Sequence, residues 1–372
     1  MTAIFNRRRR AAAETGARTR TDEGGRARAA ARWRARPSLN LLPLVLCGAA
    51  AASALALAVA VAAATWQGLA AATKQQGGGA TQTQPAQTQP AQSQAAQTQP
   101  APGAGRIESG EFPSASLGRG VRYAVSLPPA YDQKPKQRYP LVVFLHGLNN
   151  DERSWEGEGL EAKLAALRAT NKVGDYIIAM PYGANSFYIN GKDGTRYEDA
   201  IVQDFLPFVE GKYRTMPGAR HRLIEGISMG GYGALLIAFK HPELFAGVAA
   251  HSAALFAELP QPPTDPADRR GGFRYQLATK LFGTPPDAAY FQANNPLYLA
   301  KANADKIKQL KIYFDVGEQD RYGFDAGNRE LDAILTAAGV KHEYHLAPGG
   351  HGWAFLTDRS EPALTFVWNA VR

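Results

Sequence analysis

Residues Gly226–Gly230 read G-I-S-M-G and place a serine between two glycines. They follow the apolar-rich run Arg222–Glu225 and open a helical-looking run that ends near Phe239. A serine on a sharp strand-to-helix turn needs small residues two positions away on each side, because larger ones would clash. The helix that follows directs backbone N–H groups and its positive dipole end at the serine. A glycine-rich turn without a catalytic role could have the same sequence, but the flanking residues and the residues further along the chain also fit a nucleophile. We therefore predict that Ser228 is a nucleophile.

A serine nucleophile needs a general base, and in this strand–turn–helix arrangement the base is a histidine later in the chain. His351 lies in P-G-G-H-G-W, a glycine-rich loop between the last expected strand and a closing helix. Such a loop can present an imidazole to Ser228, so we predict that His351 is the base. The other downstream histidines fall at a helix end, after an earlier strand, or in the last strand: His241, His251, His342 and His345.

The base in turn needs a carboxylate to orient it, and the run D-V-G-E-Q-D offers three. Asp315 falls within an expected strand. Asp320 comes after the strand and after Gly317, where a side chain can reach a neighbouring loop. We predict Asp320 as the orienting carboxylate, with Glu318 as the second choice.

Acyl transfer also needs backbone amides that stabilise an oxyanion. The amide after the nucleophile, that of Met229, is one candidate. The second should come from the loop after an earlier strand, and H-G-L-N-N at residues 146–150 fits. We predict the Leu148 amide, with Gly147 allowing a close backbone approach. His146 is interpreted as a structural hydrogen-bonding residue.

The elements that must position these residues alternate between apolar strands and amphipathic helices. Alternation of this kind predicts an α/β fold, a mostly parallel sheet with helices on both faces. Strands are expected at residues 121–127, 141–145, 176–180, 222–225, 245–250, 311–316 and 342–346, and helices at residues 155–169, 197–213, 231–239, 328–338 and 362–371. Between His251 and Leu297 the pattern breaks at several prolines. We interpret this stretch, 252–296, as an inserted cap segment, with a functionless surface excursion as the alternative.

The first third of the chain has a different composition. Residues 1–36 hold 11 arginines and three acidic residues, which accounts for most of the net charge of +9. We expect this stretch to be a disordered cytoplasmic tail. Residues 37–73 carry no charge and include an apolar run of roughly 25 residues, long enough to span a bilayer. Residues 74–105 are a Gln/Thr/Pro/Ala low-complexity linker, and the catalytic domain is expected at residues 106–372.

Two readings of residues 37–73 remain open, an uncleaved signal anchor and a cleaved signal peptide. The anchor is preferred because the apolar run is long. The expected localisation is therefore a membrane-anchored protein with an extracytoplasmic catalytic domain, or a secreted one if the leader is cleaved. The only cysteine, Cys47, lies inside this segment, so no thiol is available in the catalytic domain.

Five blocks occur in order in residues 106–372: H-G-L-N-N, Y-E-D-A-I-V-Q-D-F-L-P-F-V-E-x-x-Y-R, G-I-S-M-G-G-Y-G-A, D-V-G-E-Q-D and G-G-H-G-W. Together they resemble an esterase family of α/β-hydrolases that includes esterase-D-like S-formylglutathione hydrolases, tributyrin and feruloyl esterases, and mycolyltransferases. The resemblance implies the α/β-hydrolase fold. It also implies a triad of Ser228, Asp320 and His351, with oxyanion amides at Leu148 and Met229.

The function expected from these residues is hydrolysis of carboxylic esters through an acyl-enzyme intermediate. Two alternatives stay open. One is acyl transfer to a sugar or lipid alcohol of the cell envelope, and the other is a non-catalytic binding protein that keeps the fold.

Around the expected site, Asn149, Tyr188 and Trp353 are candidate substrate-binding residues, with ordinary packing as the alternative. No cofactor and no metal site are expected, since neither metal-ligand spacing nor a phosphate loop is present. The expected partners are a small-molecule, glycan or lipid ester and, through residues 37–73, a membrane. The near-neutral catalytic domain gives no reason to expect nucleic-acid binding.

Overall fold

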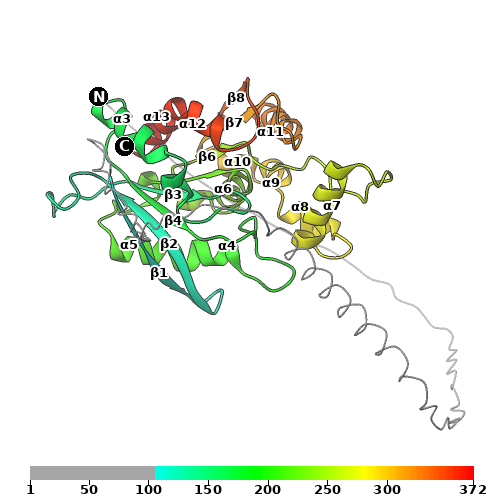
Figure 1. The fold of residues 1–372 in the computed structure, drawn as a ribbon, viewed down its shortest axis with the longest axis horizontal. Helices are drawn as coiled ribbons and strands as arrows, with labels where there is room; N and C mark the ends of the chain where they lie inside the picture. Colours follow the sequence, from blue (N-terminus) through cyan, green and yellow to red (C-terminus); the bar gives the residue numbers. More distant parts are fainter. Residues whose placement is uncertain (1–104) are drawn as a thin grey trace, which may run out of the picture. The chain divides into compact units, whose positions relative to one another are not determined.

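The computed structural model describes residues 105–372, in which helices flank an eight-stranded sheet (Figure 1). The predictions for residues 1–36, for residues 37–73 and for the linker up to residue 104 lie outside the described residues.

The sheet has the strand order β1-β2-β4-β3-β5-β6-β7-β8. The strands are β1 (Arg106–Ser114), β2 (Arg119–Leu127), β3 (Leu141–Leu145), β4 (Ile177–Pro181), β5 (Arg222–Ile227), β6 (Gly247–His251), β7 (Lys311–Gly317) and β8 (Glu343–Ala347). Strands β3 to β8 run parallel, whereas β1 pairs with β2, and β2 with β4, in antiparallel fashion. The predicted mostly parallel sheet is therefore confirmed.

The helices lie on both faces of this sheet, and each face has its own apolar core. The α-helices are α2 (Ser154–Gly157), α3 (Leu160–Ala169), α4 (Tyr197–Asp199), α5 (Leu206–Lys212), α6 (Met229–Lys240), α7 (Arg269–Phe282), α8 (Ala288–Ala293), α9 (Pro296–Ala302), α10 (Ala304–Ile307), α11 (Asp325–Ala337), α12 (Trp353–Asp358) and α13 (Ser360–Val371). Val143 belongs to the core that includes α6, and its neighbour Val142 to the core that includes α3 and α13. Successive strand residues point to opposite faces. This explains why a central strand such as L-V-V-F-L is apolar throughout and fully buried.

Two expected helices are interrupted. The helix expected at residues 155–169 is split into α2 and α3 at Gly159, whose φ of 78° lies in the left-handed region that favours glycine. The helix expected at residues 197–213 contains a π-helical stretch, Ala200–Phe205, before α5. Pro207 in the first turn of α5 has no N–H to donate to the preceding turn.

Strand β1 was not expected from the sequence. It is an edge strand, partly exposed and rich in polar residues, so it lacks the continuous apolar run of the central strands. Its Pro113 is compatible with an edge position, where one row of backbone groups needs no partner strand.

The inserted segment predicted at residues 252–296 contains α7 and α8. Asp268 caps the N-terminus of α7 by accepting a hydrogen bond from the Gly271 amide at 2.8 Å. Helix α7 buries Leu277 and Leu281. It also brings Phe273 and Leu277 to the cavity described below.

The predicted localisation needs correction. Among residues 105–372, no helix combines the length and the apolar character needed to cross a membrane. The apolar segment 37–73, on which the predicted anchor depended, lies outside the described residues.

Candidate active site

Ser228 lies between the end of β5 and the start of α6, in a backbone conformation that side chains rarely adopt. Its φ is 55° and its ψ is −113°. Three backbone hydrogen bonds hold it there. The Ser228 N–H donates to the His251 carbonyl at 2.8 Å, and the Ser228 carbonyl accepts from the Tyr232 and Ala254 amides at 3.0 and 3.1 Å. The strain of the turn is thus offset by contacts to α6 and to the chain after β6.

The spacing G-x-S-x-G follows from close packing around this turn. A Cβ on Gly226 would overlap the backbone of Gly230, and a Cβ on Gly230 would overlap the carbonyl of Leu145 at the end of β3. Both glycines are therefore required by backbone contacts, and together they leave the Ser228 side chain at the carboxyl end of the sheet. Ligand sites of parallel sheets form at that end.

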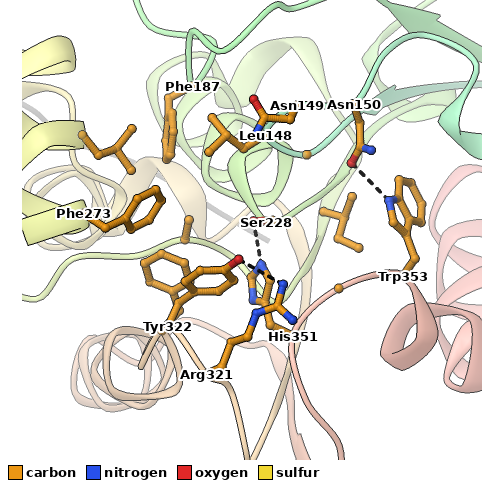
Figure 2. Close-up of a pocket in the computed structure, with 16 residues that line it drawn as sticks. Leu148, Asn149, Asn150, Phe187, Ser228, Phe273, Arg321, Tyr322, His351 and Trp353 are labelled. Atoms are coloured by element: carbon orange, nitrogen blue, oxygen red, sulfur yellow. Dashed lines mark hydrogen bonds between the residues drawn. The ribbon is translucent and has the colours of Figure 1, made fainter. Parts of the chain in front are cut away.

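His351 connects Ser228 to Asp320 by two hydrogen bonds. The Ser228 Oγ lies 2.8 Å from His351 Nε2, and the His351 Nδ1 lies 2.8 Å from Asp320 Oδ2. A neutral imidazole that donates its Nδ1–H to the carboxylate accepts the serine O–H at Nε2. The structure thus brings together the three residues predicted as nucleophile, base and orienting carboxylate, from the loops after β5, β8 and β7. Figure 2 shows Ser228 and His351 with the hydrogen bond between them.

Asp320, not Glu318, contacts the imidazole. The Asp320 side chain is fully buried, and its second oxygen accepts a hydrogen bond from the Tyr322 amide at 2.8 Å. Glu318 is exposed and bonds only to the neighbouring Gln319. The ring of Tyr322 packs edge-on against His351 with centroids 4.8 Å apart, which restricts the imidazole from the side.

The Met229 amide is next to Ser228 in the chain, and the loop that carries the Leu148 amide lies next to Ser228 in space. Met229 is the first residue of α6. The loop with Leu148 approaches closely, since a Cβ on Gly147 would lie 3.6 Å from the Cβ of Ser228. Within residues 105–372 neither amide has a hydrogen-bond acceptor. Two N–H groups next to the serine are therefore available to a ligand.

His146 supports this loop from below. Its Nδ1–H donates to the Gly147 carbonyl at 2.8 Å, and its Nε2 accepts from the Gly183 amide at 2.9 Å. Burial lowers the pKa of His146 to about 4, so the ring is neutral at physiological pH. A neutral ring is what this pair of hydrogen bonds requires, since one nitrogen donates and the other accepts.

A cavity of about 240 Å³ opens beside Ser228, and most of its wall is apolar. The wall consists of Gly147, Leu148, Asn149, Asn150, Phe187, Ile227, Ser228, Ala254, Phe273, Leu277, Arg321, Tyr322, Phe324, His351, Gly352 and Trp353. Figure 2 shows Phe187 and Phe273 on one side of the serine and Trp353 on the other. The Trp353 Nε1–H donates to Asn150 Oδ1 at 3.1 Å, which fixes the indole at the rim.

Of the three predicted substrate-binding residues, Asn149 and Trp353 line the cavity and Tyr188 does not. Tyr188 is 0% exposed, and its hydroxyl donates to the His146 carbonyl at 3.3 Å. Its neighbour Phe187 takes the position at the cavity. Both residues have a φ of 55°, in a tight turn that sends the two adjacent rings in different directions. The interpretation of Tyr188 as a substrate contact is therefore wrong, and its ring belongs to the core.

Sequence reasoning missed the wall residues contributed by the inserted segment and by the loop after Asp320. Tyr322 and Phe324 lie two and four residues after Asp320, and this proximity is a signal that could have indicated them. Phe273 and Leu277 carry no such signal, because their place depends on how α7 packs. Within residues 105–372, no group of three or more His, Cys, Asp or Glu side chains is arranged to hold a metal ion.

Comparison with known proteins gives a consistent result. A family model described as "Putative esterase" matches residues 114–357. An esterase of Mycobacterium tuberculosis is 27% identical over 264 residues, which cover 64% of this chain and 54% of the relative. An acetyl esterase of Caldicellulosiruptor saccharolyticus is 27% identical over 218 residues, which cover 58% of this chain and 77% of the relative. The chain thus spans about half the length of the mycobacterial relative.

Solved structures share the fold. A ferulic acid esterase superposes with a TM-score of 0.60 at 24% identity, covering 72% of this chain and 99% of that one. An S-formylglutathione hydrolase from Staphylococcus aureus superposes with a TM-score of 0.55 at 22% identity, covering 71% of this chain and 99% of that one. The family match covers well over half of the chain, and the sheet and its flanking helices agree with these structures. The protein therefore belongs to this esterase family and has the α/β-hydrolase fold.

Proposed function

We propose that the protein hydrolyses carboxylic esters by serine catalysis through an acyl-enzyme intermediate. The observation that carries the proposal is the hydrogen-bonded series Ser228–His351–Asp320, with 2.8 Å at each step, beside a cavity and two unpaired amides. A serine hydroxyl is a weak nucleophile unless an adjacent base removes its proton, and this arrangement supplies the base.

In the proposed first half-reaction, the Ser228 Oγ attacks the ester carbonyl carbon while its proton passes to His351 Nε2. The carbonyl oxygen becomes an oxyanion that accepts hydrogen bonds from the amides of Leu148 and Met229. Loss of one such donor typically slows an enzyme by about 10²–10³-fold. The tetrahedral intermediate then collapses. The bond to the alcohol breaks, the alcohol leaves with the proton from His351, and the acyl group stays on Ser228.

In the second half-reaction a water molecule gives a proton to His351 and attacks the acyl carbon. Collapse of this intermediate breaks the bond to Ser228, returns the proton to its Oγ, and releases the acid. In both halves Asp320 holds the Nδ1–H of His351, keeps Nε2 facing the serine, and stabilises the imidazolium while it exists.

The volume and the lining of the cavity favour an ester with a small acyl group as the substrate. A volume of about 240 Å³ bounded by Phe187, Phe273 and Leu277 suits a short alkyl or single-ring aryl group. The names of the similar proteins, an acetyl esterase and a ferulic acid esterase, agree with these two acyl types. A panel of short-chain and aryl esters is therefore the appropriate first screen.

The proposal is tested by labelling with a fluorophosphonate probe, which reacts with an activated serine. We expect labelling of the wild type, none of Ser228→Ala, and normal labelling of Ser109→Ala, a control at an exposed serine of β1. Equal labelling of the wild type and Ser228→Ala would rule out Ser228 as the nucleophile. Absence of labelling in the wild type would instead favour a binding protein that keeps the fold without turnover.

A further inference from the structure

One fixed charge lines the cavity, the guanidinium of Arg321. It follows Asp320 directly in the chain, and its side chain is exposed at the mouth. The Arg321 Nη2–H donates to the Tyr322 hydroxyl at 3.0 Å, and the Cζ atom lies 4.9 Å from the centre of the Tyr322 ring. The same ring packs against His351, so Tyr322 holds a cation close to the proposed base (Figure 2).

Helix α7 of the inserted segment brings two more cations to the same region. The Nη1 atom of Arg270 lies 3.3 Å from the point where a Cβ on Gly323 would be, so it borders the loop that carries Arg321. The Arg274 guanidinium lies over the ring of Phe256 at 5.4 Å. Arg270 and Arg274 are four residues apart on α7, so they lie on the same face of the helix, and the pKa of Arg274 is lowered by burial and by the charge of Arg270. We call Arg270, Arg274 and Arg321 the arginine rim.

Within residues 105–372, no carboxylate forms an ion pair with the arginine rim. The two acidic groups nearest in the chain are already engaged. Asp320 bonds to His351 and to a backbone amide, and Asp268 caps α7. Some arginines elsewhere in the domain do have acidic partners, as in Arg222 with Glu210. Three cations without an acidic partner, of which Arg321 lines the cavity, repel each other, and an anionic ligand would relieve that repulsion.

We propose that the preferred ester carries an ionised carboxylate in addition to the scissile ester group, and that Arg321 binds this carboxylate at the cavity mouth. Arg270 and Arg274 add to the attraction without needing direct contact. A guanidinium presents a planar pair of N–H donors that matches a carboxylate, and such charge-assisted bonds are stronger than neutral ones. This inference rests on the proposed esterase function and adds a substrate class to it.

The experiment compares pairs of esters with the same scissile bond, in which one member carries an ionised carboxylate and the other does not. p-Nitrophenyl hydrogen succinate against p-nitrophenyl methyl succinate places the charge on the acyl half. 7-Acetoxycoumarin-3-carboxylate against 7-acetoxycoumarin places it on the alcohol half. For each pair, the ratio of kcat/KM for the anionic ester to kcat/KM for the neutral ester is measured in full-length wild type, Arg321→Gln, Arg321→Lys and Lys341→Gln. Lys341 is exposed at the opposite end of β8 from His351, so its variant controls for net charge.

We expect Arg321→Gln to lower the ratio about tenfold in at least one pair, the size of one lost charge-assisted hydrogen bond. Arg321→Lys should keep the ratio within about threefold of wild type, and Lys341→Gln should leave it unchanged. The responding pair tells which half of the ester carries the carboxylate. An unchanged ratio in both pairs for Arg321→Gln would overturn the inference while leaving the esterase function intact. Failure of the wild type to turn over any of the four esters would count against the esterase function itself, and the inference would fall with it.

Discussion

Two of the imidazole–carboxylate pairs in the domain look alike, because in both the carboxylate contacts Nδ1 of the ring. His351 lies 2.8 Å from Asp320, and His251 lies 3.1 Å from Asp315, in each case through Nδ1. Both pairs join residues at the carboxyl ends of neighbouring strands. The difference lies at the second ring nitrogen. For His351 it faces the hydroxyl of Ser228, whereas for His251 it faces a second carboxylate, that of Glu225, at 3.1 Å.

That difference decides the charge of the His251 ring. His251 is 0% exposed, and burial alone would lower its pKa. The carboxylates of Asp315 and Glu225 outweigh burial and raise the pKa of His251 to about 10. His251 is therefore a fixed imidazolium at neutral pH, with no lone pair to accept a proton. An imidazole that faces one carboxylate and one hydroxyl can act as a base, whereas one held between two carboxylates cannot.

The buried pair has a structural task next to the site. Glu225, His251 and Asp315 belong to β5, β6 and β7, so their hydrogen bonds tie three adjacent strands together below Ser228. The His251 backbone carbonyl also accepts the Ser228 N–H. The two pairs thus predict opposite consequences of mutation, with loss of chemistry in one and loss of stability in the other.

The largest effect is expected for His351→Gln. Glutamine keeps polar contacts but cannot take up the Ser228 proton, and loss of a triad histidine can cost about 10⁶-fold in kcat. The unfolding temperature should change little, because the side chain lies on a loop at the cavity. Ester hydrolysis and thermal unfolding of the same preparation check both points. Retention of more than about a tenth of the wild-type kcat would contradict the assignment of His351 as base.

Asp320→Asn should come next, with a fall in kcat of about 10⁴-fold. The amide can donate to Nδ1, which favours the wrong tautomer and removes the stabilisation of the imidazolium. Glu318→Gln is the matched control, since Glu318 is exposed and makes no contact with His351. Equal losses in the two variants would mean that Asp320 has no special part.

His251→Gln should invert the pattern. Removing one member of a buried charged group leaves the other charges uncompensated, which typically costs about 3–5 kcal/mol. We expect a fall of that size in the unfolding free energy measured by urea denaturation. The kcat of the folded fraction should stay within about tenfold of wild type. A loss of activity as large as that of His351→Gln, without a loss of stability, would break the distinction between the two pairs.

The stabilising contribution of His251 should also depend on pH. Its pKa is raised in the folded state, so the contribution is fully present below the unfolded pKa of about 6.5 and is lost as pH rises through about 10. The charged and titratable groups around it are Glu225, Asp315 and Tyr313. The difference in unfolding free energy between wild type and His251→Gln should shrink steadily between these limits. A difference that grows with pH would show that the ring is neutral when buried.

Of the two imidazole–carboxylate pairs, His351 with Asp320 could be predicted from the sequence and His251 with Asp315 could not. Ser228, Asp320 and His351 could be placed near one another because each follows a strand of a parallel sheet in a known chain order. The partnership of His251 with Glu225 could not, because it depends on strand order and register, and an acidic residue in a buried strand has no visible partner along the chain. The same limit explains Tyr188, whose direction is set by a turn. It also explains Phe273, whose place is set by the packing of α7.

The smallest effect is expected for Tyr313→Phe, which tests whether a hydroxyl in the buried network stabilises the fold by hydrogen bonding or only by packing. The Tyr313 hydroxyl donates to Asp315 Oδ2 at 2.9 Å, and Tyr313 is fully buried. Tyr313→Phe removes one hydrogen bond to a charged acceptor, so the unfolding free energy should fall by about 1.5–3 kcal/mol, with kcat within about twofold of wild type.

Tyr176 provides the matched control on the same face of the sheet. It is equally buried, but its hydroxyl has no hydrogen-bond partner within residues 105–372. Tyr176→Phe removes an unsatisfied polar group and should leave stability unchanged or raise it. Equal destabilisation in the two variants would indicate that the hydroxyls act only by filling space. In that case the Tyr313 hydroxyl would not stabilise the Asp315 carboxylate, and His251 alone would compensate the negative charge of Asp315.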